Sequence, residues 1–153
     1  MSFDPAASGW TPRPGTGLAE AIGPLWTRRE GEAIVYGIPI DARHLNRGGI
    51  VHGGTICTFA DIALGVTAHE AVRPRSCATI QLNVHFVAAV QPGEFIEARA
   101  ELVRATKSLV FVRCACNVGD RVVAMADGVW KILSPGRGAN PPDFPAGRGH
   151  GEK

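Results

Sequence analysis

The stretch that decides the fold runs from Thr55 to Glu70 and reads TICTFADIALGVTAHE. Its apolar side chains recur three or four positions apart, which is the spacing of one face of an α-helix. Small and apolar residues fill almost every other position as well, as expected of a helix that neighbours bury on several sides. We therefore expect one long helix buried within the domain.

A strand with one apolar and one polar face is expected after the helix, from Ala78 to Phe86. Its alternation predicts that Thr79 lies on the polar face and Ile80 on the apolar face. Before the helix, Ala33–Ile40 predicts a strand in which Pro39 belongs at a sheet edge or a strand end. Further strands joined by tight turns are expected at Phe95–Ala105, Leu109–Val118 and Arg121–Leu133.

Tight connections between successive strands indicate an antiparallel sheet, so the predicted class is α+β, with the long helix wrapped by a curved sheet. A short helix is expected over Leu18–Ile22. Gly and Pro gather in both flanks of the chain, which predicts loose order there. The expected organisation is a flexible amino-terminal segment at 1–17, a compact domain at 18–133 and a flexible carboxy-terminal tail at 134–153.

Composition narrows the class of protein. The chain has 153 residues, of which 45% are hydrophobic, and its formal net charge is only +2. That charge is too balanced for a dedicated nucleic-acid binder, and the helix is too short and too interrupted by Asp61 to span a membrane. The amino terminus has neither the basic nor the apolar region of a secretory signal, so we expect a cytoplasmic protein. The four cysteines are expected to be free thiols.

Asp61 is conspicuous because its neighbours along the helix are nearly all apolar. An unpaired carboxylate in such surroundings is costly, so a structural reason must hold it there. One interpretation is a structural carboxylate that reaches solvent or pairs with an arginine. The other is a catalytic carboxylate, and the residues alone leave both open.

The residues His52-Gly53-Gly54 precede the same helix, where exposed backbone N–H groups can stabilise a developing oxyanion. A polar cap followed by a glycine turn is the alternative interpretation. Asp61 lies nine residues after His52, hence roughly 13 Å along the helix and nearly on its opposite side. If both act in one reaction, Asp61 of one subunit must meet His52 and Gly53 of another across a two-fold axis.

An ordered set of motifs runs through the domain: Asn46, then His52-Gly53-Gly54, then Asp61, then the strand ATIQLNVHF that begins at Ala78. The set resembles the hotdog-fold acyl-CoA thioesterases, specifically the phenylacetate-pathway-like branch of the 4-hydroxybenzoyl-CoA thioesterase superfamily. The resemblance covers about residues 18 to 133. It implies one long central helix wrapped by five to six antiparallel strands, and homodimers that join their sheets edge to edge and commonly pair into tetramers.

The resemblance also implies roles for single residues. Asp61 matches the catalytic carboxylate, which acts as general base on water or as nucleophile on the thioester carbonyl. Gly53 matches the residue whose backbone N–H polarises that carbonyl, while Asn46 and His52 match residues that orient the thioester and support the oxyanion. Thr79 falls where the family has a Ser or Thr hydroxyl that helps to place the water. An ordinary strand threonine is the alternative.

Coenzyme A enters this scheme as part of the acyl-CoA substrate, so no separate cofactor is expected, and no cluster with metal-ligand spacing exists. The family often holds the nucleotide near a hairpin. Candidates for contacts with coenzyme A are therefore Arg104, Lys107 and Ser108, with Arg73 and Arg75 as second choices.

Two other functions stay open on the same fold. Hydration of enoyl thioesters uses an Asp followed by a His, which here only Asp61 and His69 could imitate. Non-catalytic binding of acyl-CoA is the other alternative. The residues do not say which acyl group is bound.

Overall fold

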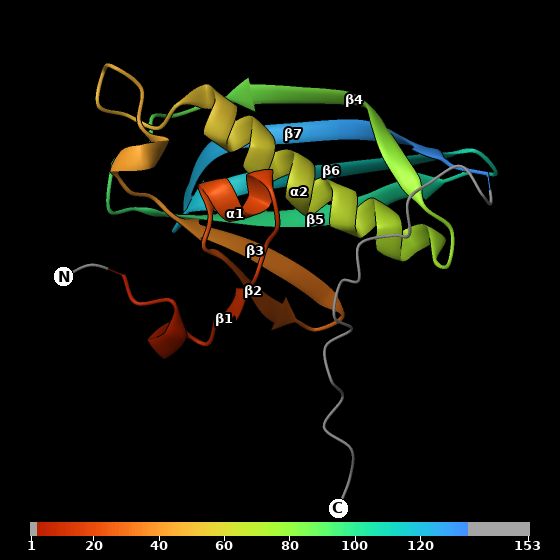
Figure 1. Ribbon diagram of the computed structural model, residues 1–153, viewed down its shortest axis with the longest axis horizontal. Helices are drawn as coiled ribbons and strands as arrows, with labels where there is room; N and C mark the ends of the chain where they lie inside the picture. Colours follow the sequence, from red (N-terminus) through yellow and green to blue (C-terminus); the bar gives the residue numbers. More distant parts are fainter. Residues whose placement is uncertain (1–2, 135–153) are drawn as a thin grey trace, which may run out of the picture.

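The computed structural model describes residues 3–134. One long helix, α2 (Gly53–Val72), packs against one face of a seven-stranded antiparallel sheet (Figure 1). The strand order across the sheet is β1-β2-β3-β5-β6-β7-β4. The strands are β1 (Thr11–Arg13), β2 (Leu25–Glu30), β3 (Ala33–Pro39), β4 (Cys77–Phe86), β5 (Phe95–Ala105), β6 (Leu109–Val118) and β7 (Arg121–Ile132). The short helical elements are η1 (Ala6–Ser8), α1 (Leu18–Ile22) and η2 (Ala42–His44).

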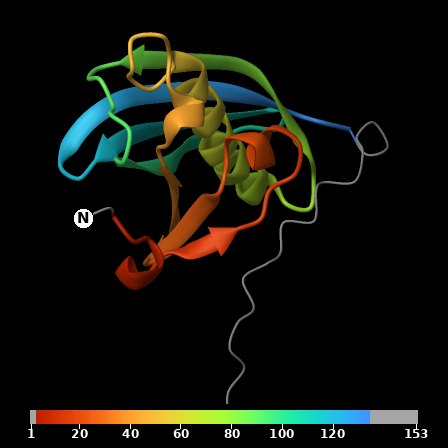
Figure 2. The ribbon, with the colours of Figure 1, turned by 60° about the vertical axis from the view of Figure 1, so that its left-hand side comes forward.

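The long helix is confirmed, and α2 extends the predicted segment by two residues at each end. It contacts strands β3 to β7, and the sheet curls around it in the view of Figure 2. Short α1 packs against α2 as well. Because neighbours surround α2, side chains at many positions around its axis, such as Phe59, Ala63 and Leu64, are fully buried. No helix in the described part of the chain has the length and apolar character needed to cross a membrane.

The α+β class is confirmed, and the sheet has two more strands than the sequence analysis placed. The strand predictions at β5 and β6 agree with the structure at both ends, and Pro39 is the last residue of β3. The additional strands, β1 and β2, precede β3 and extend that edge of the sheet, so the expected five to six strands become seven. The charged character of β2 arises on its outer face, where Arg28 forms a 2.7 Å ion pair with Glu30.

The amino-terminal segment lies against the outer face of the sheet before it turns towards the helix. Trp10 is only 3% exposed and packs with Val35 and Phe95 in a small cluster on that face. Gly37 makes room for both aromatic rings, because a Cβ there would stand 2.2 Å from Cζ of Phe95 and 2.9 Å from Cζ3 of Trp10. The segment predicted to be flexible at 1–17 thus supplies a buried tryptophan and an edge strand. The predicted tail falls, from residue 135 on, outside the described residues.

A β-bulge in edge strand β4 changes which residues face the helix. Thr79 pairs with Trp130 of β7, but the next pair is Gln81 with Val129, so Ile80 is the extra residue. The bulge places Thr79 on the same, helix-facing side as Leu82, opposite to the simple alternation of the sequence. The prediction that Thr79 lies on the polar face is therefore wrong, and Ile80, predicted on the apolar face, is 60% exposed.

Candidate functional site

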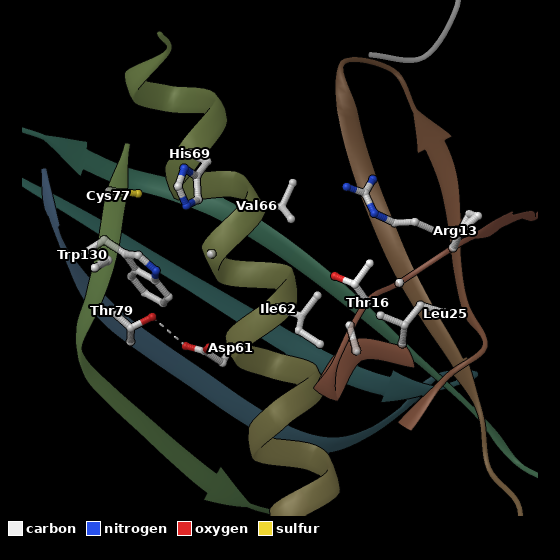
Figure 3. A pocket seen from close by; sticks show the side chains of 15 residues that line it. Arg13, Thr16, Leu25, Asp61, Ile62, Val66, His69, Cys77, Thr79 and Trp130 are labelled. Atoms are coloured by element: carbon white, nitrogen blue, oxygen red, sulfur yellow. Dashed lines mark hydrogen bonds between the residues drawn. The ribbon is translucent and has the colours of Figure 1, made fainter. Parts of the chain in front are cut away.

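A cavity of about 420 Å³ lies between the middle of α2, the start of β4 and the amino-terminal segment (Figure 3). Its walls are mostly apolar, and two charged side chains face the cavity from opposite sides. Asp61 of α2 stands on one side, and Arg13 of β1 points in from the other (Figure 3). Other lining side chains used below come from Thr16, Ile62, Val66, His69, Cys77, Thr79 and Trp130.

Asp61 is half-buried on α2, where the Thr79 hydroxyl donates a 3.0 Å hydrogen bond to its Oδ1 (Figure 3). Among residues 3–134 the structure shows no ion pair for this carboxylate. The hydrogen bond from a hydroxyl and the contact with the open cavity, rather than a paired arginine, therefore offset the cost of placing the carboxylate among apolar residues. The structure therefore brings Asp61 and Thr79 together, from a helix and a strand that lie apart in the sequence.

Trp130 forms a wall of the cavity beside Asp61 and Thr79. It is buried and lies opposite Thr79 in the β4–β7 ladder. Gly128 leaves space for the indole ring, because a Cβ at that position would stand 2.5 Å from Cζ3 of Trp130. The indole nitrogen faces Gly65 of α2, where a Cβ would stand 3.6 Å from Nε1, so the missing side chain leaves space in the cavity.

The end of the cavity near the carboxyl terminus of α2 is lined by His69 and Cys77. Burial lowers the pKa of His69 below its ordinary value of 6.5; the charge of Glu70 raises this pKa and that of Arg73 lowers it, each by less than burial. Burial also raises the pKa of the Cys77 thiol to about 11. Both groups are therefore neutral near pH 7, and Cys77 is a poor nucleophile there.

A second group of candidate residues gathers at the amino terminus of α2. His52 caps the helix, and its Nδ1 accepts a 2.9 Å hydrogen bond from the backbone N–H of Gly54. In the neutral ring the proton then sits on Nε2, which makes Nε2–H a donor directed away from the helix. Asn46 accepts a 2.8 Å hydrogen bond from the backbone of Gly48 through its Oδ1. That contact orients the side-chain amide, whose nitrogen has two N–H groups to donate.

The loop that carries these residues is anchored by buried His44, which is 1% exposed. Its Nδ1 accepts from the backbone of Asp41 at 3.0 Å, and its Nε2 donates to the carbonyl of Ile22 at 2.7 Å. Its own carbonyl accepts from the backbone of His52 at 2.8 Å. His44 therefore ties α1 and the loop to the start of α2, which is a structural role.

The two groups of site residues stay apart within one chain. Asn46, His52 and Gly53 line hollows at the amino terminus of α2, and none of them lines the cavity of Asp61. Strand β4 connects the two places, because Thr79 near its start contacts Asp61 and Phe86 at its end lies over Gly53. A Cβ added to Gly53 would stand 3.0 Å from Cζ of Phe86.

The candidates for coenzyme A contacts form a third group, at the turn between β5 and β6. Arg104, Lys107 and Ser108 are exposed at the β5–β6 hairpin, and none of them lines the Asp61 cavity. The structure brings the second-choice Arg75 to the same place, where its guanidinium donates to the carbonyl of Lys107 at 3.4 Å. Arg73 pairs with Glu70 at 3.1 Å. Within residues 3–134 no group of three His, Cys, Asp or Glu side chains could hold a metal ion.

Three polar side chains of the cavity were not singled out from the sequence: Arg13, Thr16 and Trp130. The first two lie in the Gly- and Pro-rich flank, whose composition hides the strand at Thr11–Arg13. A usable signal was present in Trp10, since a large aromatic side chain in a flank needs a place to be buried. Trp130 lies in a correctly predicted strand, but only the bulge in β4 puts it beside Thr79.

Comparisons with known proteins agree on one family. The model of the thioesterase superfamily matches residues 48–124. A Pseudomonas aeruginosa protein named "Putative esterase PA0474" is 29% identical over 117 residues, which cover 75% of this chain and 87% of that protein.

Two solved structures extend the comparison. The BH2602 protein of Bacillus halodurans, crystallised with CoA, has a TM-score of 0.70 and 27% identity, covering 78% of this chain and 80% of its own. The E. coli PaaI protein from the phenylacetic acid degradation operon has a TM-score of 0.69 at 18% identity, covering 76% of this chain and 84% of its own. At that identity the second likeness shows the fold alone.

Proposed function

Because this chain belongs to the thioesterase superfamily, we propose that it hydrolyses the thioester of an acyl-CoA at sites that two protomers complete. Family membership and the esterase relative support thioester hydrolysis in general. The relative crystallised with CoA supports coenzyme A as the leaving thiol. The observation that carries the proposal is the Asp61 carboxylate, held by the Thr79 hydroxyl on the wall of a 420 Å³ cavity.

Asp61 is the proposed catalytic carboxylate. The hydrogen bond from Thr79 occupies Oδ1 and orients the group, which leaves Oδ2 for the reaction. As a base, Asp61 takes a proton from a water molecule whose oxygen adds to the acyl carbon. As a nucleophile, it forms an anhydride that water then opens. In both routes the carbon–sulfur bond breaks, the thiol of coenzyme A leaves with a proton, and the acid is released.

The carbonyl oxygen gains negative charge in this reaction and needs donors. We assign that role to the amino terminus of α2, with the backbone N–H of Gly53 assisted by Nε2–H of His52 and the amide of Asn46. The helix dipole adds favourable partial charge at the same place. In one chain these donors and Asp61 belong to separate hollows, so each site takes its donors from the partner subunit.

The two ends of β4 explain how one symmetry operation can complete both sites. β4 is an edge strand, and the exposed apolar side chains of Ile80, Phe86 and Val87 lie along it and just beyond its end. Unprotected edges of this kind favour pairing with another strand. Antiparallel pairing of two β4 strands sets the Phe86 end of one against the Thr79 end of the other. It thereby brings Gly53 of the partner subunit towards Asp61.

The branch, the location, the assembly and the coenzyme A contacts that we propose follow the pattern of the family. We place the chain in the phenylacetate-pathway-like branch, as a cytoplasmic homodimer that pairs into a dimer of dimers. Arg104, Lys107 and Ser108, joined by Arg75 at the same hairpin, are proposed to hold the phosphates of coenzyme A. No resident cofactor takes part in this scheme.

Hydration of an enoyl thioester is the second candidate, because Asp61 and His69 line the same cavity. In that reaction a carboxylate and an imidazole activate and deliver the elements of water across a double bond. Addition of water to crotonyl-CoA, followed as loss of the conjugated thioester absorbance, distinguishes it from hydrolysis, which releases free thiol.

The experiment that tests the proposal measures thiol release from short, long and aryl acyl-CoAs by the parent protein and by Asp61→Asn. We expect turnover by the parent and a loss of at least about 10²-fold in kcat for Asp61→Asn at unchanged oligomer mass. Binding of acyl-CoA without thiol release, or an Asp61→Asn protein as active as the parent, would overturn it in favour of a binding module.

A further inference from the structure

The side chains that line the cavity beside Asp61 indicate which kind of acyl group it accepts. We propose that this chain selects a short acyl group that ends in a carboxylate, and that Arg13 is the specificity-determining residue that recognises it. This inference rests on the proposed thioester hydrolysis and adds the chemical class of the acyl group to it.

The position of Arg13 follows from strand pairing. It pairs with Leu25 in the β1–β2 ladder, so its side chain projects to the same face as Leu25, which lines the cavity. The guanidinium lies over the ring of Tyr36, 5.5 Å from its centroid, and this cation–π contact stabilises the positive charge. Figure 3 shows the group reaching from β1 towards α2, with the cavity between them.

The surroundings of Arg13 strengthen its attraction for an anion. Leu25, Ile62 and Val66 line the same space with apolar side chains, and Arg13 itself is partly buried. Charges interact more strongly in such a setting than in water. An arginine also presents a planar pair of N–H groups that matches a carboxylate in two parallel hydrogen bonds.

The remaining polar side chains of the cavity, apart from Asp61 and Thr79, are hydrogen-bond donors or can act as donors. The Thr16 hydroxyl and the Trp130 indole N–H lie on facing walls, and His69 lies further along α2 (Figure 3). Such a set suits a ligand rich in acceptor oxygens. A wholly apolar acyl chain offers no acceptor to the Thr16 hydroxyl or to the Trp130 indole N–H.

The negative charge of Asp61 sets the direction in which such a substrate binds. A terminal carboxylate is repelled by Asp61 and attracted by Arg13, so it binds at the Arg13 wall while the thioester stays near Asp61. A cavity of 420 Å³ lies towards the small end of ligand pockets, which limits the acyl group to a short one. Dicarboxylic monothioesters of about six carbon atoms combine these properties.

The test compares two substrates of equal chain length, hexanoyl-CoA and adipoyl-CoA, which differ by a terminal carboxylate. We expect the parent protein to hydrolyse adipoyl-CoA with a kcat/KM about 10- to 100-fold higher, the range of a charge-assisted hydrogen-bonded pair. Arg13→Leu should abolish that preference, because kcat/KM for adipoyl-CoA falls to the level of hexanoyl-CoA. Arg13→Gln, which keeps hydrogen bonding without the charge, should lose most of it.

The matched control is Arg29→Leu, which removes an exposed arginine from the neighbouring strand β2 and should leave the preference unchanged. Thiol release without preference for adipoyl-CoA, or a preference that survives in both Arg13 variants, would overturn the inference and leave the proposed function standing.

Binding to Asp61→Asn gives a readout that does not need turnover. Calorimetric titration of this variant should show tighter binding of adipoyl-CoA than of hexanoyl-CoA, and the added Arg13→Leu change should remove the difference. Equal affinity for the two thioesters would overturn the inference. Selective binding without any thiol release by the parent would contradict the proposed function alone.

Discussion

The hydroxyl of Thr79 lies 3.0 Å from Oδ1 of Asp61 and donates a hydrogen bond to it, although 18 residues separate the two along the chain. The contact exists because a β-bulge at Ile80 turns Thr79 towards α2. It satisfies one oxygen of a half-buried carboxylate with a neutral partner.

We expect Thr79→Val to lower kcat by about 10- to 100-fold, because a hydrogen bond to a charged group is worth about 1.5–3 kcal/mol. Valine keeps the branched shape of threonine and removes only the hydroxyl. Thr79→Ser keeps the hydroxyl and should retain most of the activity. Steady-state thiol release by the three proteins checks this, and a valine variant as fast as the parent would remove Thr79 from the mechanism.

Two inactive variants should restore activity when they form mixed dimers. One variant is Asp61→Asn, and the other combines Asn46→Ala with His52→Ala. A mixed dimer has one intact site, and random pairing makes half of the dimers mixed, so co-refolding should recover about a quarter of the parent activity. If the mixture stays as inactive as its components, Asp61 and the donors do not meet across subunits.

Gly65→Ala should make the protein more stable and its cavity smaller. Alanine in the interior of a helix is favoured over glycine by about 1 kcal/mol, and the new Cβ would stand 3.6 Å from Nε1 of Trp130, an ordinary contact. We expect a higher urea midpoint and a lower kcat/KM for bulky acyl groups. Gly37→Ala is the contrasting control, which should lower the midpoint because its Cβ would overlap Phe95.

Acid should weaken the fold partly through His69. Burial lowers the pKa of this group in the folded protein, so the unfolded chain binds its proton more readily. The stability that neutral His69 provides is therefore complete above its ordinary pKa of 6.5 and is lost as the pH falls towards the lowered value. His69→Gln should make the free energy of unfolding less dependent on pH in this range. Urea unfolding of both proteins at pH 7.5 and pH 5.5 measures the difference, and parallel losses would contradict the assignment.

Much of the fold was predictable because its patterns are local. The helix around Phe59 and the strands β5 and β6 follow from the spacing of apolar residues and from short turns. The separation of His52 from Asp61 followed from helix geometry alone. Their expected roles came from the resemblance to a family.

The features that the sequence did not predict depend on contacts between segments that are distant along the chain. The bulge at Ile80 reflects how β4 fits β7, where Gly128 admits the Trp130 ring, and no period-two pattern within β4 reveals it. The order of the amino-terminal segment depends on the space above Gly37, which belongs to another strand. Arg13 became a candidate only when β1 brought it to the wall of the cavity.

The path of the amino-terminal segment couples the two faces of the sheet. Trp10 is anchored in the cluster on the outer face, and a few residues later Arg13 and Thr16 line the cavity on the helix side. A ligand held by Arg13 therefore also favours the bound position of Trp10, since the free energies of two linked contacts are shared. In a protein whose other two tryptophans, Trp26 and Trp130, are replaced by phenylalanine, the fluorescence of Trp10 should therefore report occupancy of a site on the opposite side of the sheet.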